Sequence, residues 1–492
     1  MTFTSENILL IGSVLLIAGI LIQKLGYRVG VPSLLLFLLV GMAFGCDGLG
    51  LHFDDVHGAQ FTGIVAMCVI LFSGGMSTMI RDIRPVLGPG LVLSTVGVLL
   101  TTLFTGLFAW WVSGLEWTNI HFALLPSLLL AATTSSTDSA SVFGILRSQR
   151  LNLKYNLRPM LELESGSNDP MAYLLTVVLI GVLQAGAGNF SAWDAVTMLL
   201  RQFAIGIGAG YVLGRLTVWM TNHLRLDNAA LYPIITLGAV FLIFSVTDTC
   251  GGNGYLAVYL AGIIVGNSGD RTVGGHVVSR VRMARRRETV RFIDGLTWLF
   301  QVVMFLMLGL LVNPREMLDY WWVGLLIGLF MILVGRPLSV FLSLLPFRGL
   351  NLRSRLFVSW VGLRGAAPII FATYPVIAGV PGSGQIFNIV FFCTILSLVI
   401  QGSTIARVAS WLRLSEPAPA EENTFGVEVP EETGSKLEEV VVTAAMLAEG
   451  NTLGTMELPK GRLVMMIKRG DAFLVPNGQM EIRAGDRLLF IG

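Results

Sequence analysis

Long apolar runs constrain the fold of this 492-residue chain more than any other feature. A helix needs about 20 mainly apolar residues to cross a bilayer. On that basis thirteen stretches are predicted to be spans: residues 6–23, 31–45, 61–80, 86–111, 121–146, 159–184, 194–220, 229–247, 253–268, 293–312, 317–344, 355–379 and 385–411. Charged residues make up 13% of the chain, whereas soluble domains contain about 25%. The chain is therefore predicted to be an all-α polytopic membrane protein.

The basic residues of the connecting loops predict the orientation of these spans, because cytoplasmic loops are enriched in Lys and Arg. The loops after even-numbered spans contain only Arg315. The loops after odd-numbered spans contain the rest: Lys24, Arg28, Arg81, Arg84, Arg147, Arg150, Lys154, Arg158, Arg225, Arg271, Arg280, Arg282, Arg285, Arg286, Arg287, Arg291, Arg348, Arg353 and Arg355. We therefore expect the N-terminus outside the cytoplasm and the C-terminus inside, with membrane lipid around the spans.

An odd number of spans suits two inverted six-helix repeats joined by a central helix. The fifth span contains the polar stretch 133–139, and the twelfth contains the glycine-rich stretch 362–368. These two spans are predicted to be broken helices that cross at the middle of the membrane, in corresponding positions of the two repeats. The glycines of the seventh span, Gly206, Gly210 and Gly214, predict close helix packing, within or between subunits.

The sixth span carries an unusual polar run, because residues 161–170 read LELESGSNDP. An ionisable side chain near the bilayer centre costs at least a few kcal/mol, so it usually faces a cavity, a partner or an ion path. A carboxylate backed by hydroxyls and an amide binds a desolvated alkali ion or a proton, but hardly both at once. Asp169 is our candidate for this carboxylate, and the competition at Asp169 is sufficient for exchange.

Arg364, in the twelfth span, is predicted to need a buried carboxylate, because a buried arginine stays protonated. We expect Glu164 to supply it, which leaves Asp169 for a different task. The alternative is that Asp138, Glu164 and Arg364 only hold helices together.

The residues Glu164–Pro170, together with Thr137 and Asp138, resemble the paired signature of monovalent cation:proton antiporters. The resemblance is to the Asn-Asp branch, whose members exchange sodium or potassium for protons. The stretches 254–262, 335–337 and 362–366 also resemble that family, so the match covers about residues 1–413.

The resemblance implies a secondary antiporter of a bacterial inner membrane that exchanges K⁺, or else Na⁺, for H⁺, and not an enzyme. Asp169 would be the shared ion and proton carboxylate, Ser165 and the Thr137 region would supply neutral oxygens to K⁺ or Na⁺, and Glu164 with Arg364 would form a fixing ion pair. These residues, with Asp138 and Asn168, complete the predicted site.

Two positions bear on how far the resemblance extends. Asn168 stands where the electrogenic branch carries a second aspartate, and this favours electroneutral one-for-one exchange. Ser73 stands where many relatives carry an acid, so the resemblance does not transfer ion affinity or selectivity to this chain.

The composition changes after the last span. Residues 414–424 form a polar, proline-rich linker, and residues 425–492 contain short apolar runs separated by turn signals, which are typical of a small α+β domain. The runs are 437–442, 462–467, 473–475 and 487–491, with one short helix expected near 444–447.

This last domain resembles the C-terminal lobe of regulator-of-potassium-conductance (RCK) domains. The combination of such a lobe with an antiporter domain is similar to that of bacterial potassium/proton antiporters. It implies a cytoplasmic regulatory domain and a homodimer. A nucleotide, a cyclic dinucleotide and a cytoplasmic ion or proton are all open as its ligand, and no other cofactor is expected.

Two other functions are alternatives to the antiporter. An RCK-regulated cation channel is the first, but the chain has no filter run of the Thr-Val-Gly-Tyr-Gly kind. An intramembrane enzyme is the second, but the spans contain neither His-Glu-x-x-His nor Gly-x-Ser-x-Gly. The net charge of +2 gives no indication of a nucleic-acid partner.

Overall fold

The chain folds into two compact units, Met1–Glu416 and Pro417–Gly492. The computed structural model describes residues 8–29, 32–116, 120–149, 151–185, 192–224, 226–268, 280–417, 437–442, 444–447, 450–455, 463–470 and 472–491.

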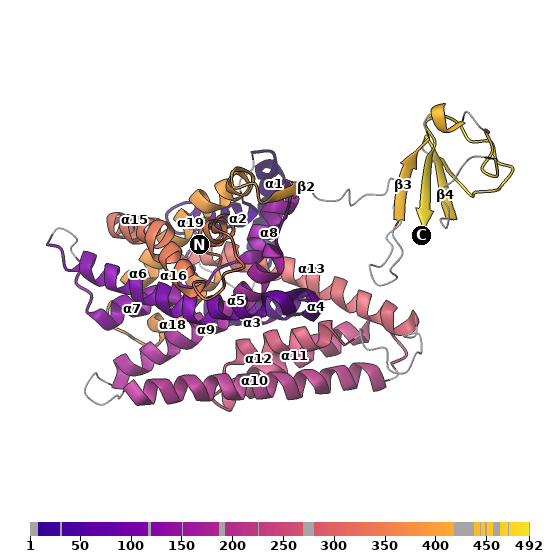
Figure 1. The fold of residues 1–492 in the computed structure, drawn as a ribbon. Coiled ribbons are helices and arrows are strands. Elements are labelled where there is room, and N and C mark those ends of the chain that lie inside the picture. The colour runs from indigo at the N-terminus through magenta and orange to yellow at the C-terminus, as the bar shows by residue number, and fades with distance from the viewer. Residues whose placement is uncertain are drawn as a thin grey trace. The chain divides into compact units, whose positions relative to one another are not determined.

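The first unit is built almost entirely of helices (Figure 1). Up to residue 185 its elements are α1 (Ile8–Val29), α2 (Ser33–Phe44), α3 (Val56–Ser77), α4 (Ile80–Ile83), η1 (Arg84–Val86), α5 (Leu87–Val92), η2 (Leu93–Gly97), α6 (Val98–Ser113), α7 (Leu124–Thr133), α8 (Ser139–Ser148), β1 (Leu151–Leu153) and α9 (Leu157–Ala185). The rest are α10 (Ala192–His223), α11 (Leu231–Thr249), α12 (Gly254–Gly266), α13 (Arg280–Leu311), α14 (Pro314–Leu318), α15 (Trp321–Phe330), η3 (Met331–Gly335), α16 (Arg336–Ser343), α17 (Leu352–Trp360), α18 (Ala367–Ile377), α19 (Ser383–Trp411) and β2 (Ser415–Pro417).

Eight helical stretches of the described residues are long and apolar enough to cross a membrane. They are Val56–Ser77, Ile80–Ser113, Leu157–Ala185, Trp193–His223, Leu231–Thr249, Arg287–Leu311, Trp321–Ser343 and Ser383–Trp411. The shorter apolar helices are Leu9–Lys24, Ser33–Phe44, Leu124–Thr133, Gly254–Gly266 and Ala367–Ile377. The predicted class, a helical polytopic membrane protein, is confirmed.

Two helices are interrupted where the sequence predicts it. The first break, residues 134–138, separates α7 from α8, and the second, residues 361–366, separates α17 from α18. The two breaks meet, because the backbone N–H of Asp138 donates to the carbonyl oxygen of Leu363 at 2.8 Å. Each break leaves helix-end carbonyls and N–H groups without a helical partner. The point where the two breaks cross is therefore polar, although the helices around it are apolar.

Two π-helical turns were not predicted from the sequence. One is η2, between α5 and α6, and the other is η3, between α15 and α16. They pack reciprocally, since η2 contacts α16 and η3 contacts α6. Single π-turns inside α-helices occur often at functional sites.

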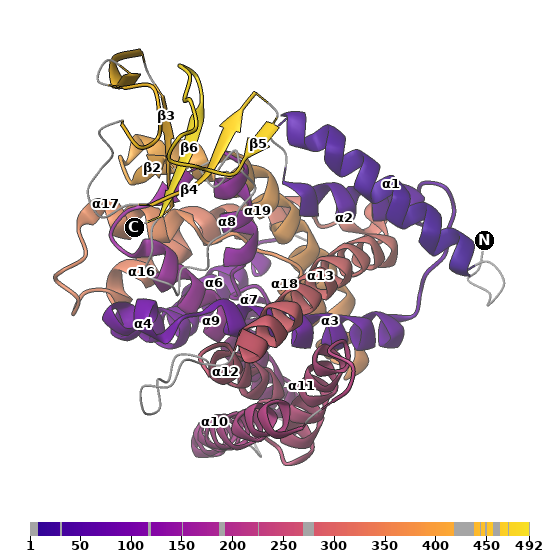
Figure 2. The same ribbon diagram turned by 90° about the vertical axis from the view of Figure 1, so that its right-hand side faces the viewer.

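Helices α10, α11 and α12 lie side by side in both views (Figures 1 and 2), and α12 also packs on α3. The glycines of α10 permit this close approach. A Cβ atom on Gly210 would lie 2.7 Å from the Ala257 carbonyl oxygen, and one on Gly214 would lie 2.9 Å from Ala261 Cα. The glycine face is therefore used within the chain, and it does not support the homodimer that the sequence suggested.

The second unit contains a four-stranded antiparallel sheet in the order β3-β6-β4-β5. Its elements are β3 (Leu437–Val441), η5 (Ala444–Leu447), β4 (Leu463–Arg469), β5 (Ala472–Leu474) and β6 (Arg487–Ile491). Its core consists of Val442, Val464, Ile467, Ile482, Leu488 and Phe490. The predicted strands and the short helix are confirmed.

The start of the predicted linker 414–424 is more ordered than expected. Strand β2 pairs with β1 of the first unit, and the Lys154 N–H donates to the Leu414 carbonyl oxygen at 3.0 Å. Residues 418–424 of that linker lie outside the described residues.

Candidate ion-binding site

Asp169 faces the break between α7 and α8. It lies on α9, and one carboxylate oxygen accepts a hydrogen bond from the Ser136 hydroxyl, which belongs to the break. Asp169 is only partly buried, whereas Asn168 and Pro170 on either side of it are buried. Asp169 therefore places a carboxylate inside a spanning helix and against a break in the neighbouring helix.

Two other predicted residues of α9, Ser165 and Asn168, hold the same break. The Ser165 hydroxyl donates to the Thr137 carbonyl oxygen at 2.8 Å and accepts from the Ser139 N–H at 3.0 Å. The Asn168 Nδ2 group donates to the Thr137 hydroxyl at 2.5 Å. The structure thus brings together Asp169, Ser165, Asn168 and Thr137, all of which the sequence had singled out.

The Asn168 side chain leaves one oxygen without a partner. Asn168 is fully buried, and its Oδ1 atom accepts no hydrogen bond from the described residues. A buried unpaired oxygen is costly, at about 1–3 kcal/mol. A bound cation or an ordered water next to Asn168 would satisfy it.

Asp138 has a structural task at the start of α8. Its carboxylate accepts hydrogen bonds from the Ser141 N–H, at 3.1 Å, and from the Ser141 hydroxyl, so it caps the N-terminal end of α8. A Cβ atom at Gly365, in the other break, would collide with this carboxylate. Asp138 therefore lies at the crossing of the two breaks, where its charge offsets the positive end of α8.

Arg364 binds on the other side of the first break, at the C-terminal end of α7. Its Nη1 atom donates to the carbonyl oxygens of Ser135 and Ser136 at 2.5 and 2.6 Å, just beyond the C-terminal end of α7. Its backbone N–H donates to the Ser397 hydroxyl of α19 at 2.9 Å. A guanidinium at a helix C-terminus stabilises the negative end of the helix dipole.

The predicted ion pair between Glu164 and Arg364 is wrong. Glu164 pairs with Arg336 of α16, and both side chains are almost completely buried. The physical reason is that Arg364 Nη1 donates instead to the carbonyl groups at the end of α7, while α16 packs alongside η2 next to α9.

Arg336 is the residue that the sequence interpretation missed. It appears there only within the resembling stretch 335–337. The signal was nevertheless present, because Arg336 lies inside the predicted span 317–344, and an arginine at that depth requires a partner.

Ser73, which stands where many relatives carry an acid, has the carboxylate of Asp294 next to it. Its hydroxyl donates to Asp294 Oδ1 at 2.7 Å, across the contact between α3 and α13. The carboxylate that Ser73 itself lacks is thus present nearby on another helix.

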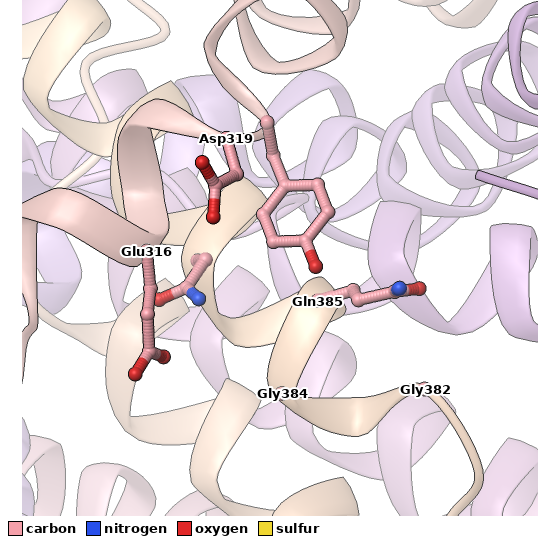
Figure 3. Close-up of a pocket in the computed structure, with 7 residues that line it drawn as sticks. Glu316, Asp319, Gly382, Gly384 and Gln385 are labelled. Atoms are coloured by element: carbon pink, nitrogen blue, oxygen red, sulfur yellow. The ribbon is translucent and has the colours of Figure 1, made fainter. Parts of the chain in front are cut away.

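A separate cavity of about 340 Å³ lies between α14 and the start of α19 (Figure 3). Its lining includes the carboxylates of Glu316 and Asp319 and the side chains of Gln385 and Asn388. None of the predicted site residues lines it.

The site around Asp169 provides one carboxylate among neutral oxygens. The described residues contain no group of three His, Cys, Asp or Glu side chains that would hold a metal ion. A single negative charge with hydroxyl, carbonyl and amide oxygens fits a monovalent cation or a proton better than a divalent metal.

Comparisons with known proteins agree with this chemistry. Residues 12–411 match the family described as "Sodium/hydrogen exchanger, transmembrane", and residues 437–492 match the TrkA-C domain. The chain is 37% identical over 489 residues to the K(+)/H(+) antiporter NhaP2 of Shewanella oneidensis, a match that covers 99% of this chain and 81% of the relative. It is 40% identical over 490 residues to the K(+)/H(+) antiporter NhaP of Alkalimonas amylolytica, with 98% and 78% covered.

The fold is also similar to a solved structure. The sodium proton antiporter MjNhaP1 from Methanocaldococcus jannaschii superimposes with a TM-score of 0.67 at 24% identity. The match covers 81% of this chain and 97% of that one.

Proposed function

The chain belongs to the sodium/hydrogen exchanger family, and from this premise we propose that it is a secondary antiporter that exchanges K⁺ for H⁺. The family and its relatives are transporters, so the protein is not an enzyme. Potassium is favoured over sodium because the relatives at 37% and 40% identity are named as K(+)/H(+) antiporters. These relatives give no support to the alternative that the chain is an RCK-regulated cation channel.

The observation that carries the proposal is the Asp169 carboxylate, which faces the broken helix and accepts a hydrogen bond from the neutral Ser136 hydroxyl. K⁺ binds to Asp169 with oxygens of Ser165, Thr137 and the Asn168 side chain, and a proton on Asp169 excludes it. Competition for one carboxylate couples the two fluxes without a direct contact between K⁺ and H⁺.

Exchange at this site is electroneutral. Asn168 is neutral, Glu164 is neutralised by Arg336, and Asp138 is committed to the end of α8. One titrating carboxylate then exchanges one cation for one proton in each cycle.

In the membrane the chain makes thirteen crossings, which are the eight long stretches and the five shorter apolar helices taken together. They form two inverted repeats, in which η2 corresponds to η3 and the first break to the second. The N-terminus lies outside the cytoplasm and the C-terminus inside it, as the basic loops indicate, and the membrane is the bacterial inner membrane.

Residues 1–413 carry out transport, residues 414–424 connect, and residues 425–492 regulate from the cytoplasm. The match to the TrkA-C domain supports a regulatory role. A homodimer places two such domains together, and a nucleotide-type ligand bound to them would bias the transporter between its conformations.

Flux measurements on reconstituted protein test the proposal. Proton movement driven by K⁺, Na⁺, Rb⁺ or Li⁺ is followed in proteoliposomes with a pH-sensitive dye. We expect K⁺ to drive the fastest exchange, with no current when the pH gradient is the only driving force. Exchange with Na⁺ but not K⁺ would overturn the assigned cation, and a cation current without proton movement would support a channel.

A further inference from the structure

Three tyrosines from three helices meet on one side of Asp169. Tyr173 lies on α9, one helical turn after Asp169. Its ring packs edge-on against Tyr255 of α12, with centroids 4.9 Å apart, and against Tyr374 of α18, with centroids 5.3 Å apart. The hydroxyl oxygens of Tyr255 and Tyr374 lie 3.4 Å apart. We call these three residues the tyrosine cluster.

Asp248 is the charged residue beside this cluster. It is the next-to-last residue of α11, one helical turn after Phe244, whose ring packs against Tyr255 with centroids 5.0 Å apart. The Asp248 side chain is exposed, although it belongs to an apolar spanning helix. An ionisable side chain in an apolar spanning helix usually faces a cavity, a partner or an ion path rather than lipid, because its exposure to hydrocarbon would be too costly.

The turn between α11 and α12 brings Asp248 to the depth of the ion site. Asn253 in this turn is fully buried, and its Nδ2 atom donates to the Pro170 carbonyl oxygen of α9 at 2.7 Å. Pro170 directly follows Asp169. The hairpin of α11 and α12 therefore ends level with the ion site instead of at the end of α9, and Tyr173, one turn after Asp169, joins the tyrosine cluster to that site.

All of these residues lie toward the same face of the membrane. Helices α9 and α17 each begin after a loop rich in basic residues, α11 begins after the loop that contains Arg225, and α12 ends before the arginine-rich stretch 271–291. Asp248, Tyr255 and Tyr374 lie at the opposite ends of their elements, which is the non-cytoplasmic side in the proposed topology.

We propose that Asp248 and the tyrosine cluster form an outer cation-binding station, which takes up the transported cation from the non-cytoplasmic side and passes it to Asp169. The inference rests on the proposed exchange function and adds a second site to it. One carboxylate and several hydroxyl oxygens replace part of the hydration shell of an alkali cation. The edge-on rings join α9 and α18 to α12, so the rings must separate before a cation passes.

The test compares the two faces of the full-length protein. Proteoliposomes with known orientation report how exchange depends on K⁺ concentration outside and inside. In Asp248→Asn, we expect the half-saturating K⁺ concentration to rise about tenfold on the non-cytoplasmic face, as the loss of one charged contact would give, and to stay unchanged on the cytoplasmic face. Tyr173→Phe keeps the ring packing and removes the hydroxyl, so it should shift the same face by a smaller factor.

Asp319→Asn is the matched control, since Asp319 lies on the separate cavity of Figure 3 and not at the tyrosine cluster. It should leave both faces unchanged. An equal shift on both faces, or no shift in both Asp248→Asn and Tyr173→Phe, overturns the station while the exchange function stands. Wild-type protein without cation-driven proton flux overturns the proposed function and the station with it.

Discussion

Glu164 and Asp169 lie five residues apart on α9, yet their surroundings give the two carboxylates different roles. Glu164 is 1% exposed and is paired with Arg336, so its charge is already neutralised. Asp169 is partly exposed, and a neutral hydroxyl is its hydrogen-bond partner among the described residues. A carboxylate that forms no ion pair is the one that gains from binding a cation or a proton.

Asp169→Asn is therefore expected to abolish exchange and to leave folding intact. The flux should fall below about a tenth of the wild-type value, because an amide takes up no proton at neutral pH. Glu162→Gln is the control on the same helix, since Glu162 forms a half-exposed pair with Arg158 at 2.9 Å. Cation-driven proton flux measures both variants, and substantial exchange by Asp169→Asn would remove Asp169 from the centre of the mechanism.

The pair of Glu164 and Arg336 is expected to matter for stability. Arg336→Leu leaves a buried charge without its partner, at a cost of about 3–5 kcal/mol. The double variant Glu164→Leu, Arg336→Leu removes both charges and should recover much of that loss. Thermal unfolding in detergent measures the series, with Arg158→Gln as an exposed-pair control. A single variant as stable as the wild type would contradict this role.

At the scale of elements, apolar length was enough to predict the helical segments, and the polar and glycine-rich stretches were enough to predict both breaks. Features that depend on tertiary packing escaped prediction. The partner of Glu164 depends on which helix packs against α9, and both residues of the true pair were visible in the sequence. The π-turns η2 and η3 leave no mark in the apolar pattern, since they arise where α6 and α16 pack reciprocally.

The crossing of the two breaks is expected to depend on the absence of a side chain at Gly365. In Gly365→Ala, the new Cβ atom would displace the Asp138 carboxylate from the end of α8, which we expect to cost about 1–3 kcal/mol. Gly144→Ala is the control, because nothing lies within 4 Å of its Cβ position in α8. Thermal stability and flux should both fall in Gly365→Ala alone, and equal behaviour of the two variants would contradict the argument.

At the scale of the whole molecule, the second unit carries its own ion pair, between a buried Asp486 and a half-buried Arg469. Asp486 is 2% exposed and accepts from Arg469 Nε at 2.9 Å and Nη2 at 2.6 Å. The hydrogen bonds from Arg469 lower the pKa of Asp486 below its ordinary value. Since the folded-state pKa is the lower one, the stabilisation is complete at neutral pH and is lost as the pH falls through the folded-state pKa.

Asp486→Asn should therefore destabilise the second unit at neutral pH by about 1–2 kcal/mol and make its stability less sensitive to acid. Hydrogen exchange of strand β6 in the full-length protein, compared at pH 7 and pH 3, measures this. Arg487→Gln is the control, because Arg487 pairs with Glu439 at a more exposed position. Unchanged protection of β6 in Asp486→Asn at neutral pH would contradict the prediction.

The place where the chain is cut decides what a truncation reveals about regulation. Strand β2 pairs with β1, so a deletion of residues 414–492 also removes a strand from the transport unit, whereas a deletion of residues 418–492 keeps it. We expect the shorter deletion to leave an active antiporter whose dependence on cytoplasmic pH or ligand is altered, because the TrkA-C domain no longer biases its conformations. The longer deletion should in addition unfold at a lower temperature.

Flux against cytoplasmic pH for the wild type and both deletions separates the two effects. Superimposable profiles for the wild type and the 418–492 deletion, with and without nucleotides, would mean that the domain does not regulate, and a folded but inactive 418–492 deletion would make it part of the transport machinery.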